Sequence, residues 1–281
     1  MNLAGKNIKC IAVDLDHTVI NSDGTMSDAT RTVIEQAIAE GIEIVPVSGR
    51  AFATFPESIG QIKGISYAVT SNGAAIYNKK TGERIHGVAI EYADLHSILD
   101  AFAHYFHNGQ ITYEAFVDGV AYGGREYVEH PEAFGVPERN VAYVQSTRKP
   151  VDDIIAFLSE HEEELDSLDI VAADTALYQK IEEQIPLVTK SVYTTSAVSY
   201  RLEISHKNSG KATGLAYVLK LLDITPEETV AFGDGDNDAE MLEFAGLGVA
   251  MENATENCKA AADIVCDCCK NDGVARFLYG F

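Results

Sequence analysis

The chain has 281 residues, with 21 basic and 43 acidic side chains and a formal net charge of −22 at pH 7. An acidic excess of this size argues against a general affinity for nucleic acid or for anionic membranes. The length predicts two domains or one enlarged α/β domain.

The first third of the chain alternates strand and helix patterns. Short apolar runs over 9–13 and 42–47 predict strands, and the apolar face of 27–40 predicts a helix between them. This order favours a right-handed βαβ unit with parallel strands. Residues 65–70 predict a third strand, and a hairpin is expected around 79–82.

The pattern changes over residues 87–191, where hairpins mix with helices. Helices are predicted over 92–107, 151–164 and 174–184, and strands over 110–117, 120–123, 141–145, 168–172 and 187–194. Such a mixture is typical of an α+β module, so we expect this segment to be an insert in the sheet domain.

The α/β alternation resumes in the last third. Strands are predicted over 200–204, 229–233 and 247–250, and helices over 210–222, 237–244, 254–261 and from about 272. We therefore expect a doubly wound, Rossmann-like parallel sheet formed by 1–86 and 192–281, with the α+β insert at 87–191.

Cysteine spacing and apolar run length indicate the compartment. Five cysteines, three of them within 266–269, do not form the even set of a secreted disulfide framework. The sequence also lacks a run approaching the roughly 20 apolar residues that cross a bilayer. We expect a cytoplasmic protein without a membrane partner and assign no metal role to the cysteine cluster.

The pair Asp14 and Asp16 directly follows the first predicted strand. In extended chain, side chains two residues apart point the same way, so both carboxylates can face one point. Two acids held together favour a cation or a proton, which suits a nucleophile and a proton donor beside a divalent metal. The same spacing also occurs in many solvated turns, so the pair needs support from elsewhere in the chain.

That support comes from polar residues at the ends of other predicted elements. Ser48 and Asp234 follow strand-like runs, and Lys211 opens a predicted helix. Ligands of open parallel sheets bind beyond the carboxyl ends of the strands, and helix N-termini favour anions. Residues about 200 positions apart are therefore expected to share one crevice.

Together these motifs resemble the haloacid dehalogenase superfamily phosphatases, specifically the Cof-type class IIB branch with a large α/β cap. The resemblance covers essentially the whole chain. It includes Ser71-Asn72-Gly73-Ala74, Leu202-Glu203-Ile204, Val249-Ala250-Met251-Glu252-Asn253-Ala254 and Asn271-Asp272-Gly273-Val274-Ala275.

The resemblance implies a role for each acid. Asp14 would attack phosphorus and form an aspartyl-phosphate, while Asp16 would protonate the leaving alkoxide and then activate water. Mg²⁺ would be held by the Asp14 side chain, the Asp16 backbone carbonyl and Asp234. Asp238 would be a further ligand or an orienting group.

The same resemblance implies that Ser48, Gly49 and Lys211 hold the non-reacting phosphate oxygens. Asn72 and Asn237 are expected to orient the site on the substrate side. Two neighbouring residues stay open at this stage. Arg50 can bind an anion or pair with a carboxylate, and His17 has no assigned role.

We therefore expect a Mg²⁺-dependent phosphatase acting on a small phosphorylated metabolite, with sugar phosphates first and phosphorylated cofactors second. The protein would be a monomer or a small homo-oligomer. A phosphomutase on the same scaffold is an alternative, and so is a non-catalytic metabolite-binding regulator or a phosphorylated receiver-like module. Asp16 argues against the last two, because a stable phospho-signal needs no acid/base at this place.

Overall fold

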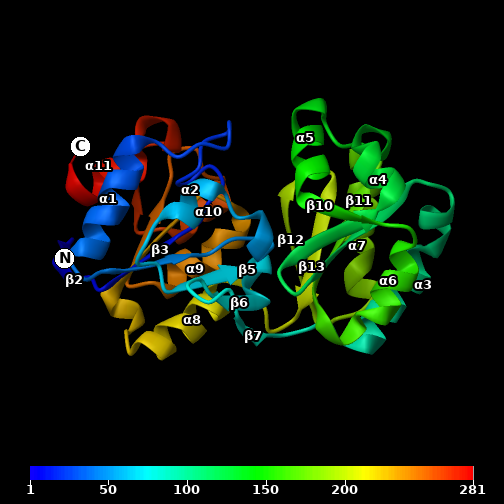
Figure 1. Cartoon of the computed structure of the whole chain (residues 1–281), viewed down its shortest axis with the longest axis horizontal. Coiled ribbons are helices and arrows are strands. Elements are labelled where there is room, and N and C mark those ends of the chain that lie inside the picture. The colour runs from blue at the N-terminus through cyan, green and yellow to red at the C-terminus, as the bar shows by residue number, and fades with distance from the viewer. Residues whose placement is uncertain (281) are drawn as a thin grey trace. The chain divides into compact units, whose positions relative to one another are not determined.

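The computed structural model describes residues 1–280, and these divide into two compact units (Figure 1). The core unit contains residues 1–50, 55–86 and those from 210 onward. The inserted unit contains 87–209 and a short segment, 51–54. The chain therefore enters the inserted unit twice.

A five-stranded parallel sheet forms the centre of the core unit, in the order β16, β15, β14, β3, β4. The strands are β3 (Cys10–Val13), β4 (Glu43–Pro46), β14 (Thr229–Gly233), β15 (Leu247–Ala250) and β16 (Ile264–Val265). Their carboxyl ends therefore lie along one edge. The predicted α/β class with a doubly wound parallel sheet is confirmed.

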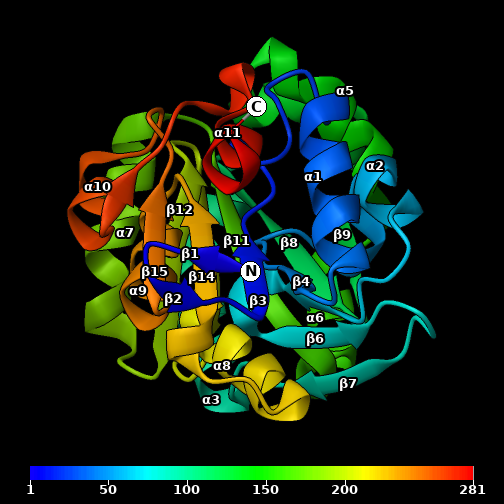
Figure 2. The same cartoon turned by 90° about the vertical axis from the view of Figure 1, so that its left-hand side faces the viewer.

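Helices cover both faces of this sheet. They are α1 (Asp28–Ala39), α8 (Lys211–Leu222), α9 (Ala239–Phe244), α10 (Glu256–Ala261) and α11 (Gly273–Tyr279). Alternation along β3 sends Ile11 and Val13 into the core shared with α1 and α11, which lie on the same side of the strands in Figure 2. Cys10 and Ala12 face the opposite core, which contains residues of α8, α9 and α10.

Shorter elements complete the core unit. Strands β5 (Tyr67–Thr70), β6 (Ala75–Asn78) and β7 (Arg84–Gly87) form a small sheet, and an isolated parallel bridge joins Val47 to Val69. The remaining elements are the antiparallel pair β1 (Asn2–Leu3) and β2 (Lys6–Asn7) and helix α2 (Glu57–Gln61). The strand predicted over 65–70 corresponds to β5, and the hairpin expected around 79–82 is the turn that joins β6 to β7, where Asn78 N–H donates to Glu83 O at 2.9 Å.

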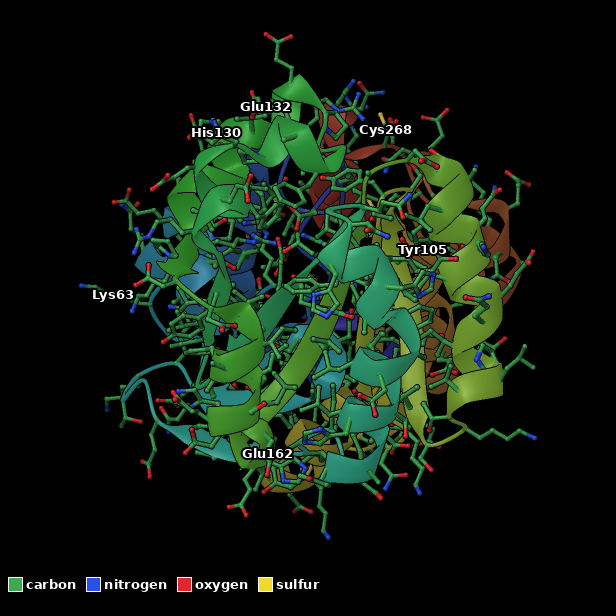
Figure 3. All side chains as sticks on the ribbon, turned by 90° about the vertical axis from the view of Figure 1, so that its right-hand side faces the viewer. Lys63, Tyr105, His130, Glu132, Glu162 and Cys268 are labelled. Atoms are coloured by element: carbon green, nitrogen blue, oxygen red, sulfur yellow. The ribbon has the colours of Figure 1, made fainter. Side chains whose placement is uncertain are left out.

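The inserted unit has one six-stranded mixed sheet, in the order β10, β9, β8, β11, β13, β12. The strands are β8 (Ile111–Val117), β9 (Val120–Gly124), β10 (Arg148–Val151), β11 (Leu165–Ala172), β12 (Val192–Val198) and β13 (Arg201–His206). The helices are α3 (Tyr92–His107), α4 (Arg125–Glu129), α5 (Glu138–Thr147), α6 (Ile154–Glu160) and α7 (Thr175–Val188). Residues of α3, α6 and α7 share a core with one face of the sheet, and Tyr105 of α3, labelled in Figure 3, belongs to it.

The other face of this sheet contains a buried ionic cluster around Glu114. Arg148 donates from Nε to Glu114 Oε1 at 3.0 Å and from Nη2 to Oε2 at 2.8 Å, and Tyr127 donates its hydroxyl to Oε1. Arg201 lies 3.7 Å from the same carboxylate. Burial alone would raise the pKa of Glu114, but the two guanidinium groups outweigh it and hold the pKa below its usual value.

The segment Ala51–Thr54 joins the inserted unit through backbone and apolar contacts. Ala53 N–H donates to Gly119 O at 2.8 Å, and Ala51 packs in a small cluster with Phe116 and Ala121. This segment begins two residues after Gly49, and only Arg50 separates it from the predicted phosphate-binding residues Ser48 and Gly49. The sequence contained no signal that separated it from the core.

Three predicted elements of the insert differ from the structure. The strand expected over 187–194 begins only at Val192, because helix α7 continues to Val188. Residues 141–145, predicted as a strand, lie inside helix α5, and the predicted helix over 151–164 is shorter, with strand β10 in front of it. The apolar pattern of 141–145 is too short to distinguish a helical period from a strand period. Pro137, with φ −60° and an extended ψ of 145°, is the N-cap residue directly before the helix.

The predicted end of the insert at residue 191 also differs from the structure. Strands β12 and β13 form a hairpin that pairs antiparallel with β11 of the inserted unit, so the predicted core strand over 200–204 is wrong in its sheet. The last segment of the core unit instead begins at Gly210. An apolar run predicts a strand but does not tell which strand it pairs with. The predicted boundary between the insert and the core at residue 191 was therefore too early in the chain.

Within residues 1–280, every helix is too short or too polar to span a bilayer. The five cysteines are free thiols.

Candidate active site

Two acids lie where adjacent parallel strands end. Asp14 follows β3, is 5% exposed, and donates its backbone N–H to Phe232 O of β14 at 2.9 Å. Asp234 is the first residue after β14. Because β3 and β14 are direct neighbours, their carboxyl ends bring these two carboxylates together although 220 positions separate them in sequence.

Lys211 joins this pair from the first turn of α8. Its buried ammonium donates to Asp14 Oδ1 at 2.7 Å and to Asp238 Oδ1 at 2.7 Å. Burial acts to lower the pKa of Lys211, but Asp14 and Asp238 outweigh it and raise the pKa, so the ammonium stays charged. A fixed positive charge thus lies beside the carboxylate proposed to attack phosphorus.

A close backbone approach fixes the start of α8. Gly210 N–H donates to Asn72 O at 2.8 Å, and Gly73 has φ +88°. A Cβ on Gly73 would lie 2.0 Å from Gly210 O, so only glycine fits there. The Ser71–Gly73 turn therefore sets the position from which Lys211 reaches Asp14.

Asp238 orders the loop that carries Asp234. Its Oδ2 accepts from the backbone N–H groups of Asp234 at 3.0 Å and Gly235 at 2.9 Å, while Oδ1 accepts from Lys211. Both carboxylate oxygens are thus already engaged. This geometry favours the orienting role for Asp238 that the sequence left as an alternative to metal ligation.

The carboxylates fit a divalent cation. Asp14, Asp234 and Asp238 offer oxygen atoms that all lie within 4.8 Å of one another. Three carboxylates against one ammonium leave two negative charges, which a divalent cation would neutralise. Hard carboxylate oxygens are the ligands that Mg²⁺ prefers.

The pKa shifts in the cluster reflect this uncompensated charge. Burial raises the pKa of Asp14 well above its usual value, with the negative charges of Asp238 and Asp234 adding to the effect against Lys211. Burial and repulsion from Asp238 raise the pKa of Asp234 to about 7. A bound cation would reverse both effects, because it favours the ionised carboxylates.

Asp16 points to Arg50. Arg50 donates from Nε to Asp16 Oδ2 at 2.7 Å and from Nη2 to Oδ1 at 2.7 Å. Burial acts to raise the pKa of Asp16, but the two hydrogen bonds and the charge of Arg50 lower it overall. The open question about Arg50 is thus answered in this structure, since its partner is a carboxylate of the site.

The predicted phosphate-binding and orienting residues form a hydrogen-bonded chain. The Ser48 backbone carbonyl accepts from Asn72 N–H at 3.1 Å, and Asn72 Oδ1 accepts from Asn237 Nδ2 at 3.0 Å. The Ser48 hydroxyl oxygen accepts from the Arg50 N–H at 3.2 Å, and Gly49 lies between these two residues. This chain links the ends of β4, β5 and β14.

The turn after β3 contains a residue in the left-handed region. His17 has φ 60°, and the Leu15 carbonyl accepts from the backbone N–H of Val19 at 3.1 Å and Ile20 at 2.8 Å. The left-handed region costs roughly 1 kcal/mol or more for a residue with a side chain. The His17 side chain is exposed, so its backbone conformation is the feature that shapes the turn.

Two residues that contact the cluster had no assigned role. Thr18 donates its hydroxyl to Asp234 Oδ1 at 3.4 Å, and Asn253 donates from Nδ2 to Asp234 Oδ2 at 3.2 Å. Thr18 follows the Asp14 motif directly, and Asn253 belongs to one of the motifs of the resemblance. The sequence could indicate these two residues only through their position in or next to a motif, because it does not show that Asp234 is their hydrogen-bonding partner.

Comparison with known proteins agrees with this architecture. The sequence profile of the haloacid dehalogenase-like hydrolases matches residues 11–278. Phosphatase YwpJ of Bacillus subtilis (strain 168) is 31% identical over 295 residues, covering 96% of this chain and 99% of that protein. The 5-amino-6-(5-phospho-D-ribitylamino)uracil phosphatase YcsE of the same organism is 28% identical over 274 residues, covering 97% and 95%.

A solved structure supports the same relationship. The haloacid dehalogenase-like hydrolase from B. subtilis is similar with a TM-score of 0.80 and 28% identity, covering 96% of this chain and 98% of that chain. The matched profile and the full-length relatives span both units of the fold. The chain therefore belongs to the haloacid dehalogenase-like hydrolase family, and it is a phosphatase of that family.

Proposed function

We propose that this protein is a Mg²⁺-dependent phosphatase that hydrolyses small phosphomonoesters through an aspartyl-phosphate on Asp14. The observation that carries the proposal is the contact of buried Asp14 with Lys211, beside the carboxylates of buried Asp238 and half-buried Asp234. A carboxylate placed beside a fixed positive charge is suited to attack phosphorus, because the charge spread over the phosphoryl oxygens is stabilised there.

In the first step Asp14 attacks phosphorus and the bond from phosphorus to the ester oxygen breaks. Asp16 gives its proton to the leaving alkoxide. In the second step water attacks the aspartyl-phosphate, Asp16 accepts the water proton, and the bond to Asp14 breaks to release phosphate. Lys211 and the Ser48-Gly49 backbone would bind the non-reacting oxygens.

Mg²⁺ would be held by Asp14, Asp234 and the Asp16 carbonyl, with Asp238 orienting the loop. When bound, the metal supplies positive charge that stabilises the transferring phosphoryl group. Nucleophilic attack, proton transfer and binding of the phosphate oxygens are assigned to residues of the core unit.

Two classes of substrate are proposed, sugar phosphates first and phosphorylated cofactors second. YcsE and YitU of B. subtilis, 28% and 29% identical to this chain, both carry the name of a phosphatase for a phosphorylated ribitylamino compound. That compound combines a sugar-derived chain with a ring, so it belongs in the substrate panel beside sugar phosphates and pyridoxal and flavin phosphates.

The test is phosphate release from this panel by the wild type, Asp14→Asn, Asp16→Asn and the control Asp236→Asn. Asp236 lies in the same loop as Asp234 but accepts from Thr255, so its variant should keep wild-type activity. Both other variants should lose at least about 10³-fold in kcat, because each group acts in the covalent route.

The products separate the alternatives. Inorganic phosphate supports the phosphatase, whereas an isomerised sugar phosphate would support a phosphomutase. Wild-type protein that is as inactive as Asp14→Asn on the whole panel would favour a non-catalytic regulator and overturn the proposal.

A further inference from the structure

Asn253 bridges three loops of the core unit. It lies in the turn between β15 and α10, and its Nδ2 donates to His17 O at 3.0 Å and to Asp234 Oδ2 at 3.2 Å. Its Oδ1 accepts from the Cys269 backbone N–H at 3.2 Å. One exposed side chain therefore joins the loop after β3, the loop after β14 and the loop before α11.

The Cys269 N–H sets the orientation of the Asn253 amide. A backbone N–H can only donate, so the side-chain oxygen must face Cys269 and the NH₂ group must face the other two loops. Both hydrogens of the NH₂ group then have an acceptor, one in the His17 carbonyl and one in Asp234. A reversed amide would place oxygen against two acceptors, which leaves one orientation.

The loop that supplies this N–H is itself ordered. Asp267 Oδ1 accepts from the Cys268 N–H at 2.9 Å and from Asn271 Nδ2 at 2.9 Å. Cys268, labelled in Figure 3, is half-buried beside it. The donor that fixes Asn253 is therefore held in place before any ligand binds.

Both carboxylate oxygens of Asp234 accept a hydrogen bond from a side chain of another loop. Thr18 donates to Oδ1 and Asn253 donates to Oδ2, while the same Asn253 NH₂ group holds the carbonyl one residue after Asp16. Groups that hydrogen-bond a metal-ligating carboxylate fix its direction and raise the affinity of the site. The turn that contains the left-handed His17 gains a tertiary contact from the same bond.

We propose that Asn253 is a positioning residue that holds Asp234 and the turn after Asp16 in the arrangement that binds the divalent cation. This inference rests on the proposed function, because it assigns the cation to the Asp14 and Asp234 cluster. Asn253 acts through these two partners and has no direct role in phosphoryl transfer.

The test is a calorimetric titration of the full-length protein with MgCl₂, for the wild type, Asn253→Ser and Asn253→Ala. Serine keeps one hydroxyl donor, so affinity should fall in the order wild type, serine, alanine, with a loss of at least about tenfold for alanine. The melting temperature of each variant is measured without metal. Glu256→Ala, a truncation of a 95% exposed side chain at the start of α10 that leaves the three hydrogen bonds in place, should bind as the wild type does.

The outcomes distinguish this inference from the proposal on which it rests. If Asp234→Asn binds Mg²⁺ as tightly as the wild type, the assigned cation site is wrong and the proposed function fails with it. If Asp234→Asn loses binding while Asn253→Ala and Asn253→Ser keep the wild-type affinity, only the role of Asn253 is overturned. Equal losses in Asn253→Ala and Glu256→Ala would also contradict it, since a general disturbance of this segment would then account for the effect.

Discussion

Arg50 binds Asp16 through two parallel hydrogen bonds of 2.7 Å, one to each carboxylate oxygen. Bidentate pairs of this kind fix direction as well as charge. The pair lowers the pKa of Asp16, so it favours the ionised form, which in the proposed mechanism accepts a proton from water. Protonation of the leaving group in the proposed mechanism requires the neutral form of Asp16, so we expect substrate binding to weaken the pair during each turnover.

Replacing Arg50 should affect substrates according to their leaving groups. An alkyl phosphate needs a proton from a well-placed Asp16, whereas p-nitrophenyl phosphate has a leaving group that is stable as an anion. We expect Arg50→Ala to lower kcat/KM for the alkyl ester at least about tenfold more than for the aryl ester, within the range of general acid catalysis. Steady-state kinetics on both esters measure the ratio, and an equal loss on both would contradict this role.

Removal of divalent metal should abolish activity. The carboxylates of buried Asp14 and half-buried Asp234 repel each other without a cation, and Lys211 compensates only part of their charge. Dialysis against EDTA should eliminate phosphate release, and added MgCl₂ should restore it. Activity that persists after dialysis, with the metal content checked by elemental analysis, would exclude a metal from the mechanism.

Gly73→Ala should destabilise the core unit and disturb Lys211. The new Cβ would meet Gly210 O at 2.0 Å in a left-handed backbone, so the expected loss is at least about 3 kcal/mol in the free energy of unfolding. Gly60→Ala is the matched control, because α2 offers open space at that position and alanine favours helix by about 0.5–1 kcal/mol. Urea unfolding followed by circular dichroism compares them, and similar midpoints would refute the steric argument.

Glu114→Gln should destabilise the inserted unit by leaving Arg148 buried without its counter-charge. Breaking one partner of a buried ion pair costs about 3–5 kcal/mol. The double variant Glu114→Gln with Arg148→Met should recover much of this loss, because both charges are then absent. Chemical unfolding of both single variants and the double variant measures the coupling energy. A loss of unfolding free energy in the double variant that equals the sum of the two single losses would argue against a direct pair.

The same ion pair predicts a pH dependence of stability. The native pKa of Glu114 is held below its usual value of 4.5, so the unfolded state takes up this proton first as pH falls. The stabilisation is complete above about pH 4.5 and is lost as pH falls through the lower native pKa. The difference in unfolding free energy between wild type and Glu114→Gln should therefore shrink at acid pH, and a constant difference would contradict it.

Most of the architecture could be predicted from the spacing of apolar residues and from the order of strands and helices along the chain. Helix α3 and strand β14 have the bounds expected from sequence, because each has one unambiguous period and clear ends. The hairpin of β12 and β13 could not be assigned to its sheet, since its apolar residues fit either a parallel or an antiparallel neighbour. Only the three-dimensional pairing with β11 decides between them.

In the candidate site, too, the positions of strand ends could be predicted from the sequence, whereas contacts between loops could not. The ends of β3 and β14 could be placed on one sheet edge from the chain order alone, which brought Asp14 and Asp234 into one expected crevice. The Arg50 pair with Asp16 and the Asn253 bridge depend on loop conformations. Side-chain hydrogen bonds between loops leave no periodic trace in a sequence.

The double entry of the chain into the inserted unit limits how that unit can be exchanged. A minimal variant spliced from residue 86 to residue 210 would remove the partners of Ala51 and Ala53, namely Phe116, Ala121 and the Gly119 carbonyl. Ala51–Thr54 would then have lost these packing and hydrogen-bonding partners, although it directly follows Arg50 in the chain. Grafting a foreign insert for a new specificity therefore requires redesign of two stretches of sequence at once, the large one and these four residues.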